Sequence, residues 1–573
     1  MKKPLQSKGL SRILPIFNWL RDYPASWLSR DVLAGVTTAA VVIPQAMAYA
    51  GLAGLPVEVG LYAALTPMLV YVLLGTSRVL SVSVTSTISL LTFSVLSAAI
   101  SSTDPAELIL AAGTLAALVG ALLILASILR LGFLANFISY PVLAGFKAGI
   151  GVTILVSQIG KAMGFSVPKA GLIETVIRTL QSLNQTKLSA VVVSVVVLAV
   201  LILLPRLNRR IPTALIAVAV GIISAYFLNR SGAGVKLAGE IPVGLPVFTL
   251  PELNLVRDLL PGALGIALMS FTESIAASRA FTEKNDPTID ANQELLALGA
   301  ANLLGGFFQA YPAGGGTSQT AVNKGSGART QIAALATALT VGVTLLFLAP
   351  LVSLIPQPAL AALVIVAAGG LIKIADFQAI SRYRKLELIW AFTAFVGVLV
   401  VGTLEGILIA VLLSVLMLLH AANHPPAYAV GRKPGTEIFR SLEDFPEDET
   451  LPGLLIMRTE GWLNFASMPN IREKLGQLVV ENEPKVVILE CSAITDVEYT
   501  ALMGLLEAEE KLAKAGVKLW LVGLNPKPFK KIRGSKLGQI LGNERMYPNL
   551  HEAASSYLAQ NADFGKPQVN VQN

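Results

Sequence analysis

The chain has 573 residues, of which 54% are hydrophobic and only 14% are charged. Because soluble globular proteins are about a quarter charged, this composition excludes a protein that is surrounded by water along its whole length. The single cysteine excludes an internal disulfide framework. Three histidines beside that one thiol argue against a dedicated zinc site, so no metal cofactor is expected.

The charges divide the chain into two parts of different composition. Residues 432–573 hold 17 of the 44 basic and 19 of the 36 acidic residues, which is an ordinary soluble balance. Residues 1–431 keep the other 27 basic and 17 acidic residues, so this larger part is apolar with a net charge of +10. Its basic residues stand singly or in small groups between apolar runs, which argues against nucleic acid as a partner. The lipid bilayer is the expected surrounding of this part.

Uncharged stretches in the first part are long enough to cross a bilayer, whose core needs about 20 apolar residues per helix. The stretch 330–372 is too long for one helix, and Pro350, Pro356 and Pro358 mark where a turn divides it. The other stretches are 32–57, 59–77, 79–103, 108–129, 211–229, 388–404 and 406–431, with shorter runs at 133–146, 148–160, 189–204, 259–272 and 295–311. Together they predict an α-helical polytopic membrane protein with about fourteen segments.

Basic loops set the expected orientation. Arg130, Arg206 and the group Arg382, Arg384 and Lys385 follow even-numbered segments, and basic residues also precede the first segment. By the positive-inside rule these loops and both termini lie in the cytoplasm, and we expect a multi-pass protein of the plasma (cell inner) membrane. Residues 1–30 lack the features of a cleavable signal peptide and include a short interfacial helix at residues 14–20.

Two segments inside the apolar part are poor membrane helices. Residues 80–87 are rich in hydroxyl groups and residues 311–323 in glycine, and each is expected to start as extended chain and continue as a short helix. The two segments are about 230 residues apart. The segments starting near Leu33 and near Ala263 are the same distance apart, and this matched spacing indicates an inverted-repeat transporter. Facing half-helix N-termini present free N–H groups and positive dipole ends, which favour an anion. The alternative is that the small residues only let helices pack closely.

Glu273 is the candidate for proton coupling. It follows an uncharged run at 259–272, so it is expected within the membrane. A carboxylate there costs a few kcal/mol, which makes it a functional candidate that can take up and release a proton. The alternative is a structural ion pair with Arg279 or a position near the interface.

Gln45 and Tyr49 are candidates for substrate binding from the first segment. They are four residues apart, so both project from one face of the helix, and Pro44 weakens the local hydrogen bonds. An amide and a phenol that face one cavity suit an oxyanion. The alternative is an interhelical hydrogen bond from Gln45, with Tyr49 serving only for packing.

The last part alternates short apolar strands with helices. Strands are expected at 454–458, 485–490 and 517–522, and helices at 467–481, 500–515 and 549–560. This alternation predicts a small α/β domain over residues 453–561, after a polar linker at 432–452 and before a C-terminal tail at 562–573. The turn at 492–499 is the expected place of an interaction or phosphorylation site. In this division residues 1–30 are a cytoplasmic N-terminal segment and residues 31–431 the transmembrane domain.

Five stretches of the membrane part have a distinctive sequence, namely 42–62, 75–87, 273–276, 317–323 and 327–330. Together with the residues around Asn292 and Asn302, these stretches resemble the sulfate permease (SulP) family of anion transporters, whose members carry a cytoplasmic STAS domain. The resemblance extends over nearly the whole chain. It implies a 7+7 inverted repeat with gate and core subdomains, elevator-like movement and a homodimer. It also implies an anion site between the third and tenth segments, formed here by Gln45, Tyr49, Thr85, Ser86, Gly316, Thr317, Ser318 and Gln319.

The chain departs from the family pattern at two places. Many members have Ser-Arg where this chain has Ser318-Gln319, so a positive charge at the anion site is missing. In the STAS domain, Glu498-Tyr-Thr-Ala501 stands where bacterial anti-sigma antagonists have Asp-Ser-Ser-Gly, which puts Thr500 at the phosphoacceptor position.

The leading hypothesis is a secondary active transporter that imports sulfate, bicarbonate, a dicarboxylate or a related small anion with a proton. Glu273 carries the coupling proton, and sodium is the alternative coupling ion. An uncoupled anion exchanger or channel is one alternative, and a membrane-anchored STAS scaffold is another. No enzymatic activity is expected, because nothing resembles a hydrolase triad or a kinase signature.

Overall fold

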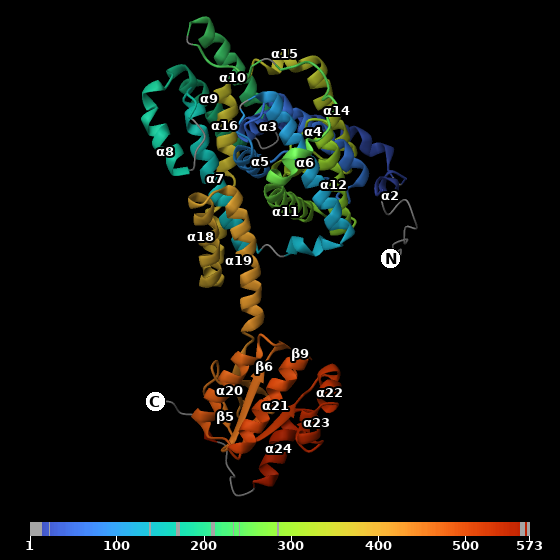
Figure 1. The fold of residues 1–573 in the computed structure, drawn as a ribbon, viewed down its shortest axis with the longest axis vertical. Helices are drawn as coiled ribbons and strands as arrows, with labels where there is room; N and C mark the ends of the chain where they lie inside the picture. Colours follow the sequence, from blue (N-terminus) through green and yellow to red (C-terminus); the bar gives the residue numbers. More distant parts are fainter. Residues whose placement is uncertain are drawn as a thin grey trace. The chain divides into compact units, whose positions relative to one another are not determined.

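The computed structural model describes residues 14–21, 23–102, 104–136, 139–167, 172–207, 213–232, 234–239, 241–283, 286–561 and 568–569. The chain forms two compact units, Met1–Val415 and Leu416–Asn573 (Figure 1). Expectations for residues 1–13, 562–567 and 570–573 fall outside the described residues.

The unit Met1–Val415 is called the membrane unit below, and its first half begins where the sequence predicts an interfacial helix. Asp104 caps α6 ahead of Pro105, and Ser139 caps α7, so these starts carry ordinary helix signals. The elements are α2 (Ile16–Arg21), η1 (Ala25–Trp27), α3 (Leu28–Ala53), α4 (Val57–Leu74), β1 (Val82–Ser83), α5 (Ser86–Ala99), α6 (Pro105–Ile128), η2 (Leu131–Asn136), α7 (Tyr140–Ala162), α8 (Leu172–Gln181), η3 (Leu183–Gln185), α9 (Leu188–Leu207) and α10 (Thr213–Arg230).

The second half of this unit contains a matching series. The stretch 330–372 divides as expected, because a turn at 353–356 leads to Pro356, the N-cap of the next helix. The elements are η4 (Leu253–Leu255), α11 (Val256–Phe281), α12 (Ala291–Phe307), β2 (Gly314–Gly315), α13 (Thr317–Gly325), α14 (Ile332–Val343), the π-helical η5 (Thr344–Leu348), α15 (Ala349–Val352), α16 (Gln357–Gly369), α17 (Ile374–Tyr383), α18 (Lys385–Val400) and α19 (Thr403–Asn423).

The two halves repeat one another element by element. α3 and α11 each have 26 residues, and α5 and α13 each follow a two-residue strand. When α8 and α17 are left aside and α14 to α15 is counted as one interrupted helix, each half contributes seven helices from α3 onward in the described chain. β1 and β2 pair antiparallel, as two inverted halves require where they meet. The predicted 7+7 inverted repeat is therefore confirmed.

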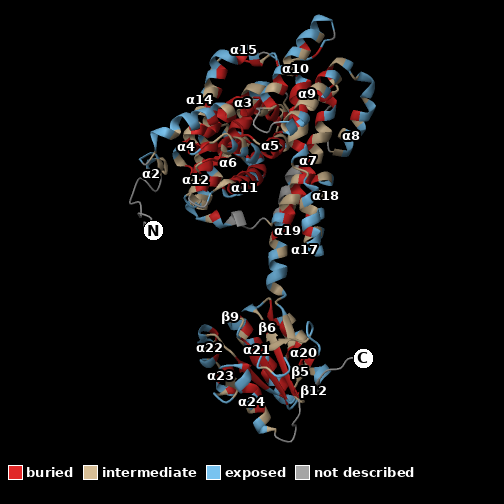
Figure 2. Cartoon of the chain, turned by 180° about the vertical axis from the view of Figure 1, so that it is seen from behind, coloured by how far each residue is buried: buried red, intermediate tan, exposed pale blue. Residues whose placement is uncertain are grey.

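Nine helical stretches of the described residues are long and apolar enough to cross a bilayer. α5 and α13 are shorter, as expected of half-helices. Large apolar side chains remain exposed on the outer helices, among them Ile202, Ile223 and Phe392, which fits a surface that faces lipid. Buried residues gather instead in α3, α4, α6 and α11 (Figure 2).

The membrane helices pack in two groups. α3, α4, α5, α6, α11, α12 and α14 contact one another, with α13 against α3 and α11. In the other group α7 packs against α16 and α18, while α9 packs against α10 and α16. The first group corresponds to the expected core subdomain and the second to the gate.

One difference from the sequence prediction concerns residues 133–160. The sequence divides them into two apolar runs at Lys147, but α7 continues through this position from Tyr140 to Ala162. The helix tolerates the lysine because its ammonium has a carboxylate partner, Glu273.

The second unit is built around one mainly parallel sheet. β6 (Leu454–Thr459), β8 (Val486–Glu490), β10 (Lys518–Val522) and β11 (Met546–Tyr547) are parallel neighbours in the order β11-β10-β8-β6. The antiparallel strands β3 (Ala427–Arg432), β5 (Glu449–Thr450) and β12 (Gln568–Val569) extend the sheet beyond β6, and β4 (Phe439–Ser441) pairs with β3. A second, two-stranded sheet joins β7 (Gly461–Leu463) and β9 (Ile494–Val497).

Helices cover both faces of the large sheet, which explains the continuous apolar strands. Alternate residues of β8 separate the two cores: Val487 and Leu489 face one, and Val486 and Ile488 face the other. The first core includes α20 (Met468–Asn482), α21 (Tyr499–Lys514), α22 (Pro526–Arg533) and α23 (Lys536–Leu541), and the second includes α24 (Leu550–Gln560). The predicted α/β domain is therefore confirmed.

The segment expected to be a linker differs from that expectation. The sheet begins at Ala427, and residues 432–452 contain β4 and β5. Arg432 pairs with Glu449 and Arg440 with the buried Asp448, so the charge-rich composition reflects ion pairs within a folded edge. The predicted turn at 492–499 likewise contains β9, and β12 lies in the stretch expected to be a tail.

Candidate functional site

The two broken segments of the membrane unit cross each other against α11. Val82 faces Gly315 and Ser83 faces Gly314 across the β1–β2 pair. Two serines of α11 hold the second strand: Gly315 N donates to Ser274 Oγ at 2.6 Å, and Ser270 Oγ donates to Ala313 O at 2.7 Å. A Cβ atom on Gly315 would lie 2.8 Å from Ser274 Cα, so the strand can approach this close only with glycine.

The crossing places two helix N-termini at one location. At α5, the N-cap Thr85 accepts a hydrogen bond from Ile88 N at 3.3 Å. At α13, the N-cap is Gly316, to which no side chain of the described residues contributes a cap. The first backbone bond of α13 runs from Thr320 N to Gly316 O, so the N–H groups of residues 317–319 lie outside the helical ladder. Such groups, at the positive end of a helix, are suited to an anion.

A cavity of about 80 Å³ lies at these N-termini. One buried water needs roughly 10–15 Å³, so the space suits an ion of a few atoms rather than a nucleotide or a sugar. The structure brings all nine membrane residues singled out from the sequence to its wall. The lining consists of Gln45, Tyr49, Val84, Thr85, Ser86, Thr87, Lys147, Glu273, Gly316, Thr317, Ser318, Gln319 and Leu371.

Glu273 lies on α11 at the edge of this cavity and is 7% exposed. Its Oε2 accepts a hydrogen bond from Thr85 Oγ1 at 3.2 Å, and its Oε1 is 3.5 Å from Lys147 Nζ. The sequence offered Arg279 as the alternative ion-pair partner, whereas the partner in the structure is Lys147 of α7. The carboxylate is thus held between the N-cap of one half-helix and a cation of the gate group.

Two amide side chains contribute unpaired acceptors to the cavity wall. Among the described residues, Gln45 Oε1 and Gln319 Oε1 are buried without a hydrogen-bond partner. Gln319 is 2% exposed, and its Nε2 donates to Val84 O at 3.1 Å, which fixes the amide. Buried polar atoms normally have partners, and an amide oxygen can only accept, so these two atoms need a donor such as a water molecule or a protonated group and do not themselves bind an ionised anion.

The sequence prediction missed four residues of this wall, Val84, Thr87, Lys147 and Leu371, and Lys147 is the charged one among them. The absence of arginine at position 319 was interpreted as a missing positive charge, but Lys147 brings a charge to the same cavity. A signal was present in the sequence, because a single lysine interrupts an otherwise apolar run that spans 133–160. The rule that marked Glu273, that an ionisable group at membrane depth is a functional candidate, applies equally to this lysine.

The arrangement is suited to binding an oxyanion. In the part of the chain that the structure describes, no group of three or more His, Cys, Asp or Glu side chains could hold a metal ion. The cavity instead combines helix N–H groups, hydroxyls and a lysine, which are donors for an oxyanion.

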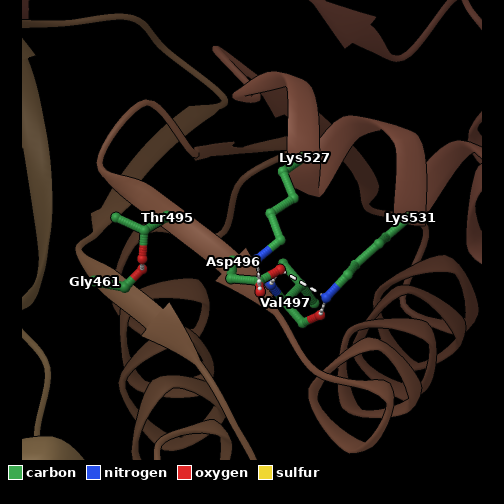
Figure 3. Close-up of polar contacts among 6 residues, drawn as sticks. All are labelled: Gly461, Thr495, Asp496, Val497, Lys527 and Lys531. Carbon is green, nitrogen blue, oxygen red and sulfur yellow. Dashed lines mark hydrogen bonds and ion pairs between the residues drawn. The ribbon is translucent and has the colours of Figure 1, made fainter. Parts of the chain in front are cut away.

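Thr500, the residue at the phosphoacceptor position, lies in the second unit. It is exposed and is the second residue of α21. In the strand just before this helix, Asp496 accepts hydrogen bonds from Lys527 Nζ at 2.6 Å and Lys531 Nζ at 2.7 Å (Figure 3). The two lysines of α22 hold the pKa of the Asp496 carboxyl well below its usual range.

Comparison with known proteins assigns the two units. Residues 28–394 match the sulfate permease family, and residues 445–553 match the STAS domain. The chain belongs to the sulfate permease family. It is therefore an anion transporter of this family and not an enzyme.

Relatives that match over most of their length are found in a bacterium and in a plant. A probable sulfate transporter of Mycobacterium tuberculosis is 34% identical over 542 residues, covering 94% of this chain and 96% of the relative. The chloroplastic sulfate transporter 4.1 of Arabidopsis thaliana is 31% identical over 572 residues, covering 96% of this chain and 83% of the relative.

Two solved structures share the fold. The structure of SLC26A9 is similar with a TM-score of 0.86 and 26% identity, covering 97% of this chain and 94% of that one. The transmembrane domain of the cyanobacterial bicarbonate transporter BicA has a TM-score of 0.60 and 24% identity, covering 68% of this chain and 98% of that one. The similarity to BicA supports the fold alone.

Proposed function

We propose that this sulfate permease family protein is a secondary active transporter that imports a small inorganic anion together with a proton. The observation that carries the proposal is the cavity at the N-termini of α5 and α13, where Gln45, Tyr49, Thr85 and Ser86 meet residues 316–319. Helix N–H groups and hydroxyls in a site of low dielectric attract an anion, and these groups need no net charge of their own.

Sulfate is the leading substrate, with bicarbonate as the second. The relatives with the highest identity reported above are named as sulfate transporters, one of them as a probable one. The small cavity favours either of these ions over a larger dicarboxylate. Sulfate has four acceptor oxygens, which suit the N–H, hydroxyl and ammonium donors of the wall.

Glu273 is the proposed coupling group. An anion that enters beside an ionised Glu273 places two negative charges together in a low dielectric, and protonation of the carboxylate removes that repulsion. Binding of the proton and of the anion should therefore favour each other. A proton is the preferred coupling ion because it neutralises the Glu273 carboxylate directly. Sodium stays the alternative, since hydroxyl and amide oxygens in the same lining could ligate it.

The two packing groups suggest how the anion crosses the membrane. The cavity belongs mainly to the core group, through α3, α5, α11 and α13, and faces α7 of the gate group. An elevator-like shift of the core along the gate would carry the loaded cavity from one side to the other. The basic loops around Arg130, Arg206 and Arg384 support cytoplasmic termini in the cell inner membrane. A homodimer joined through the gate groups would give the moving core a fixed support.

Transport by the purified full-length protein in liposomes tests this function. We expect labelled sulfate to accumulate above equilibrium when the outside is acidic, and to equilibrate only when the pH is the same on both sides. Glu273→Gln should still bind and exchange sulfate but should not accumulate it. Accumulation by Glu273→Gln equal to that of the wild type would show that this carboxylate is not the coupling group.

The ion pair with Lys147 favours a second candidate, an uncoupled anion exchanger. If the Lys147–Glu273 pair is permanently ionised, Glu273 has a structural role and the protein exchanges anions without a proton. Sulfate–sulfate exchange that is independent of a pH gradient, combined with no accumulation by the wild type, would favour this candidate.

A further inference from the structure

We propose that Lys147 is the cationic half of the anion site, and that the anion and the Glu273 carboxylate compete for its ammonium group. This inference rests on the proposed function and adds to it the charge balance of the site. It follows from where the two charges lie, since neither is on the half-helices that present the N–H groups.

The positions of the two residues support competition between the anion and the carboxylate. Lys147 Nζ is 3.5 Å from Glu273 Oε1, a distance at which the two charges attract but the hydrogen bond is long. The lysine side chain is 25% exposed and the glutamate side chain 8% exposed, and both line the cavity. An ammonium that is only loosely held by one anion can turn to another.

The net charge of the cavity then controls which states are stable. In the empty site Lys147 and Glu273 neutralise each other. A monovalent anion bound to Lys147 leaves Glu273 unpaired unless this carboxylate takes up a proton. With a monovalent anion such as bicarbonate, the empty site and the site loaded with both anion and proton are therefore the two neutral states. With sulfate, the site that holds anion and proton keeps one net negative charge, which faces the positive N-terminal ends of α5 and α13. Anion without proton leaves the site one unit more negative than anion with proton, and such added charge in a low dielectric is costly.

This balance predicts one proton for each anion bound. Glu273 is the one carboxylate in the described lining, so one proton releases Lys147 from its partner and makes the ammonium available to the anion, whether the anion is bicarbonate or sulfate. The pair also joins the two packing groups, because Lys147 is on α7 and Glu273 is on α11. Loading of the cavity thus breaks a direct contact between gate and core.

The surrounding elements bring few other ionisable groups to this pair. Within the described lining of the cavity, the one further titratable side chain is that of Tyr49. Charged side chains on the helices that pack against α7 and α11 have other partners or lie at helix ends. Glu294 of α12 accepts hydrogen bonds from Tyr71 and Thr76, Lys324 of α13 pairs with Glu283, and Glu174 of α8 pairs with Arg178. The others lie in terminal turns of α6, α9, α17 and α18, namely Glu107, Arg206, Asp376, Arg382, Lys385 and Glu387.

The test is binding of radiolabelled sulfate to the purified full-length protein between about pH 5 and 8.5, where sulfate itself stays fully ionised. We expect the dissociation constant of the wild type to increase with pH by up to tenfold per unit, as one linked proton requires. Glu273→Gln should bind tightly at all these pH values, because its lysine is always available. Lys147→Gln should bind on the order of tenfold more weakly or worse even at low pH, since it lacks the cation.

Two further variants keep the test independent of folding. Lys147→Arg retains the charge and should recover most of the affinity that Lys147→Gln loses. Lys161→Gln alters a lysine of the same helix, outside the cavity lining and bonded to Gly51 O, and should bind sulfate like the wild type. Sulfate affinity in folded Lys147→Gln equal to that of the wild type would overturn the inference.

The outcome for this inference can be told apart from the outcome for the proposed function. If the wild type accumulates sulfate with a pH gradient while Lys147→Gln binds and accumulates it equally well, only the role of Lys147 is overturned. If the wild type neither binds nor transports sulfate or bicarbonate, the proposed function itself fails.

Discussion

Ser83 of β1 and Gly314 of β2 face each other in register across an antiparallel pair that joins the two halves of the repeat. The pair is short, yet it sets the distance between the N-termini of α5 and α13 and therefore the size of the anion cavity. Its closeness to α11 depends on glycine, since a Cβ on Gly315 would meet Ser274 Cα and the Leu80 side chain at 2.8 Å.

Gly315→Ala should therefore damage the site. The backbone of α11 cannot move away as a flexible side chain can, so overpacking should cost about 1–3 kcal/mol and widen the crossing. We expect weaker sulfate binding together with a lower melting temperature in detergent. Gly325→Ala is the control, because a Cβ at Gly325 meets nothing within 4 Å. Equal affinity for both variants would show that the crossing tolerates displacement.

The N–H groups of α13 can be tested one at a time. Ser318→Pro removes a donor that the helical ladder does not use, in the first turn, where proline is tolerated. We expect sulfate binding to be lost while the protein stays folded in detergent. Ser318→Ala keeps the N–H and should lose at most a small part of the affinity. The site would have to lie elsewhere if Ser318→Pro bound sulfate normally.

Much of this site could be predicted from sequence because its signals are local. The break at 311–323 is visible as a run of glycine and hydroxyl residues, and Glu273 as a charge after a long apolar run. Lys147 was missed because its meaning depends on a partner 126 positions away, which only the packing of α7 against the core reveals. The strands β4 and β5 were missed for a similar reason: they have three and two residues, and their pairing with β3 defines them.

Asp31 holds the core together and should matter for stability instead of transport. It is fully buried and accepts hydrogen bonds from Arg329 N at 2.6 Å, Thr330 N at 3.2 Å and Thr330 Oγ1 at 2.7 Å. Asp31→Ala leaves these donors unpaired, at about 1–3 kcal/mol each.

The melting temperature of the Asp31→Ala protein in detergent should fall by several degrees, whereas the folded fraction should bind sulfate with normal affinity. Asp104→Ala, at the exposed N-cap of α6, is the control and should cost only about 1 kcal/mol. A loss of sulfate affinity with an unchanged melting temperature would assign Asp31 to the site.

Asp496 should anchor α22 over a wide pH range. Because Lys527 and Lys531 hold its pKa below the usual value, the carboxylate is ionised in the folded protein, and its contribution to stability is present above the unfolded pKa of about 3.9. That contribution is lost only as the pH falls through the lower folded pKa. Hydrogen exchange of residues 526–533 in the full-length protein, corrected for intrinsic rates, should therefore be the same at pH 7 and pH 5. Asp496→Asn should exchange faster at both pH values, whereas Asp444→Asn, at an exposed position, should exchange like the wild type. Weaker protection of residues 526–533 at pH 5 than at pH 7 in the wild type would contradict the pairing.

The boundary between the two units can be tested by truncation, and the strand β3 decides where the cut must lie. A chain that ends after His424 keeps α3 to α18 and all of α19 and removes the whole sheet. A chain that ends after Gly435 retains β3 without its partners β6, β4 and β5, and such an unpaired apolar edge promotes aggregation. Size-exclusion chromatography in detergent should therefore give a single symmetrical peak for the first truncation and aggregates for the second.

In liposomes the first truncation should transport the same anion as the full chain, at a lower rate or without regulation, because every lining residue of the cavity precedes position 424. A changed anion preference in this variant would mean that the second unit contributes to the selectivity of the site.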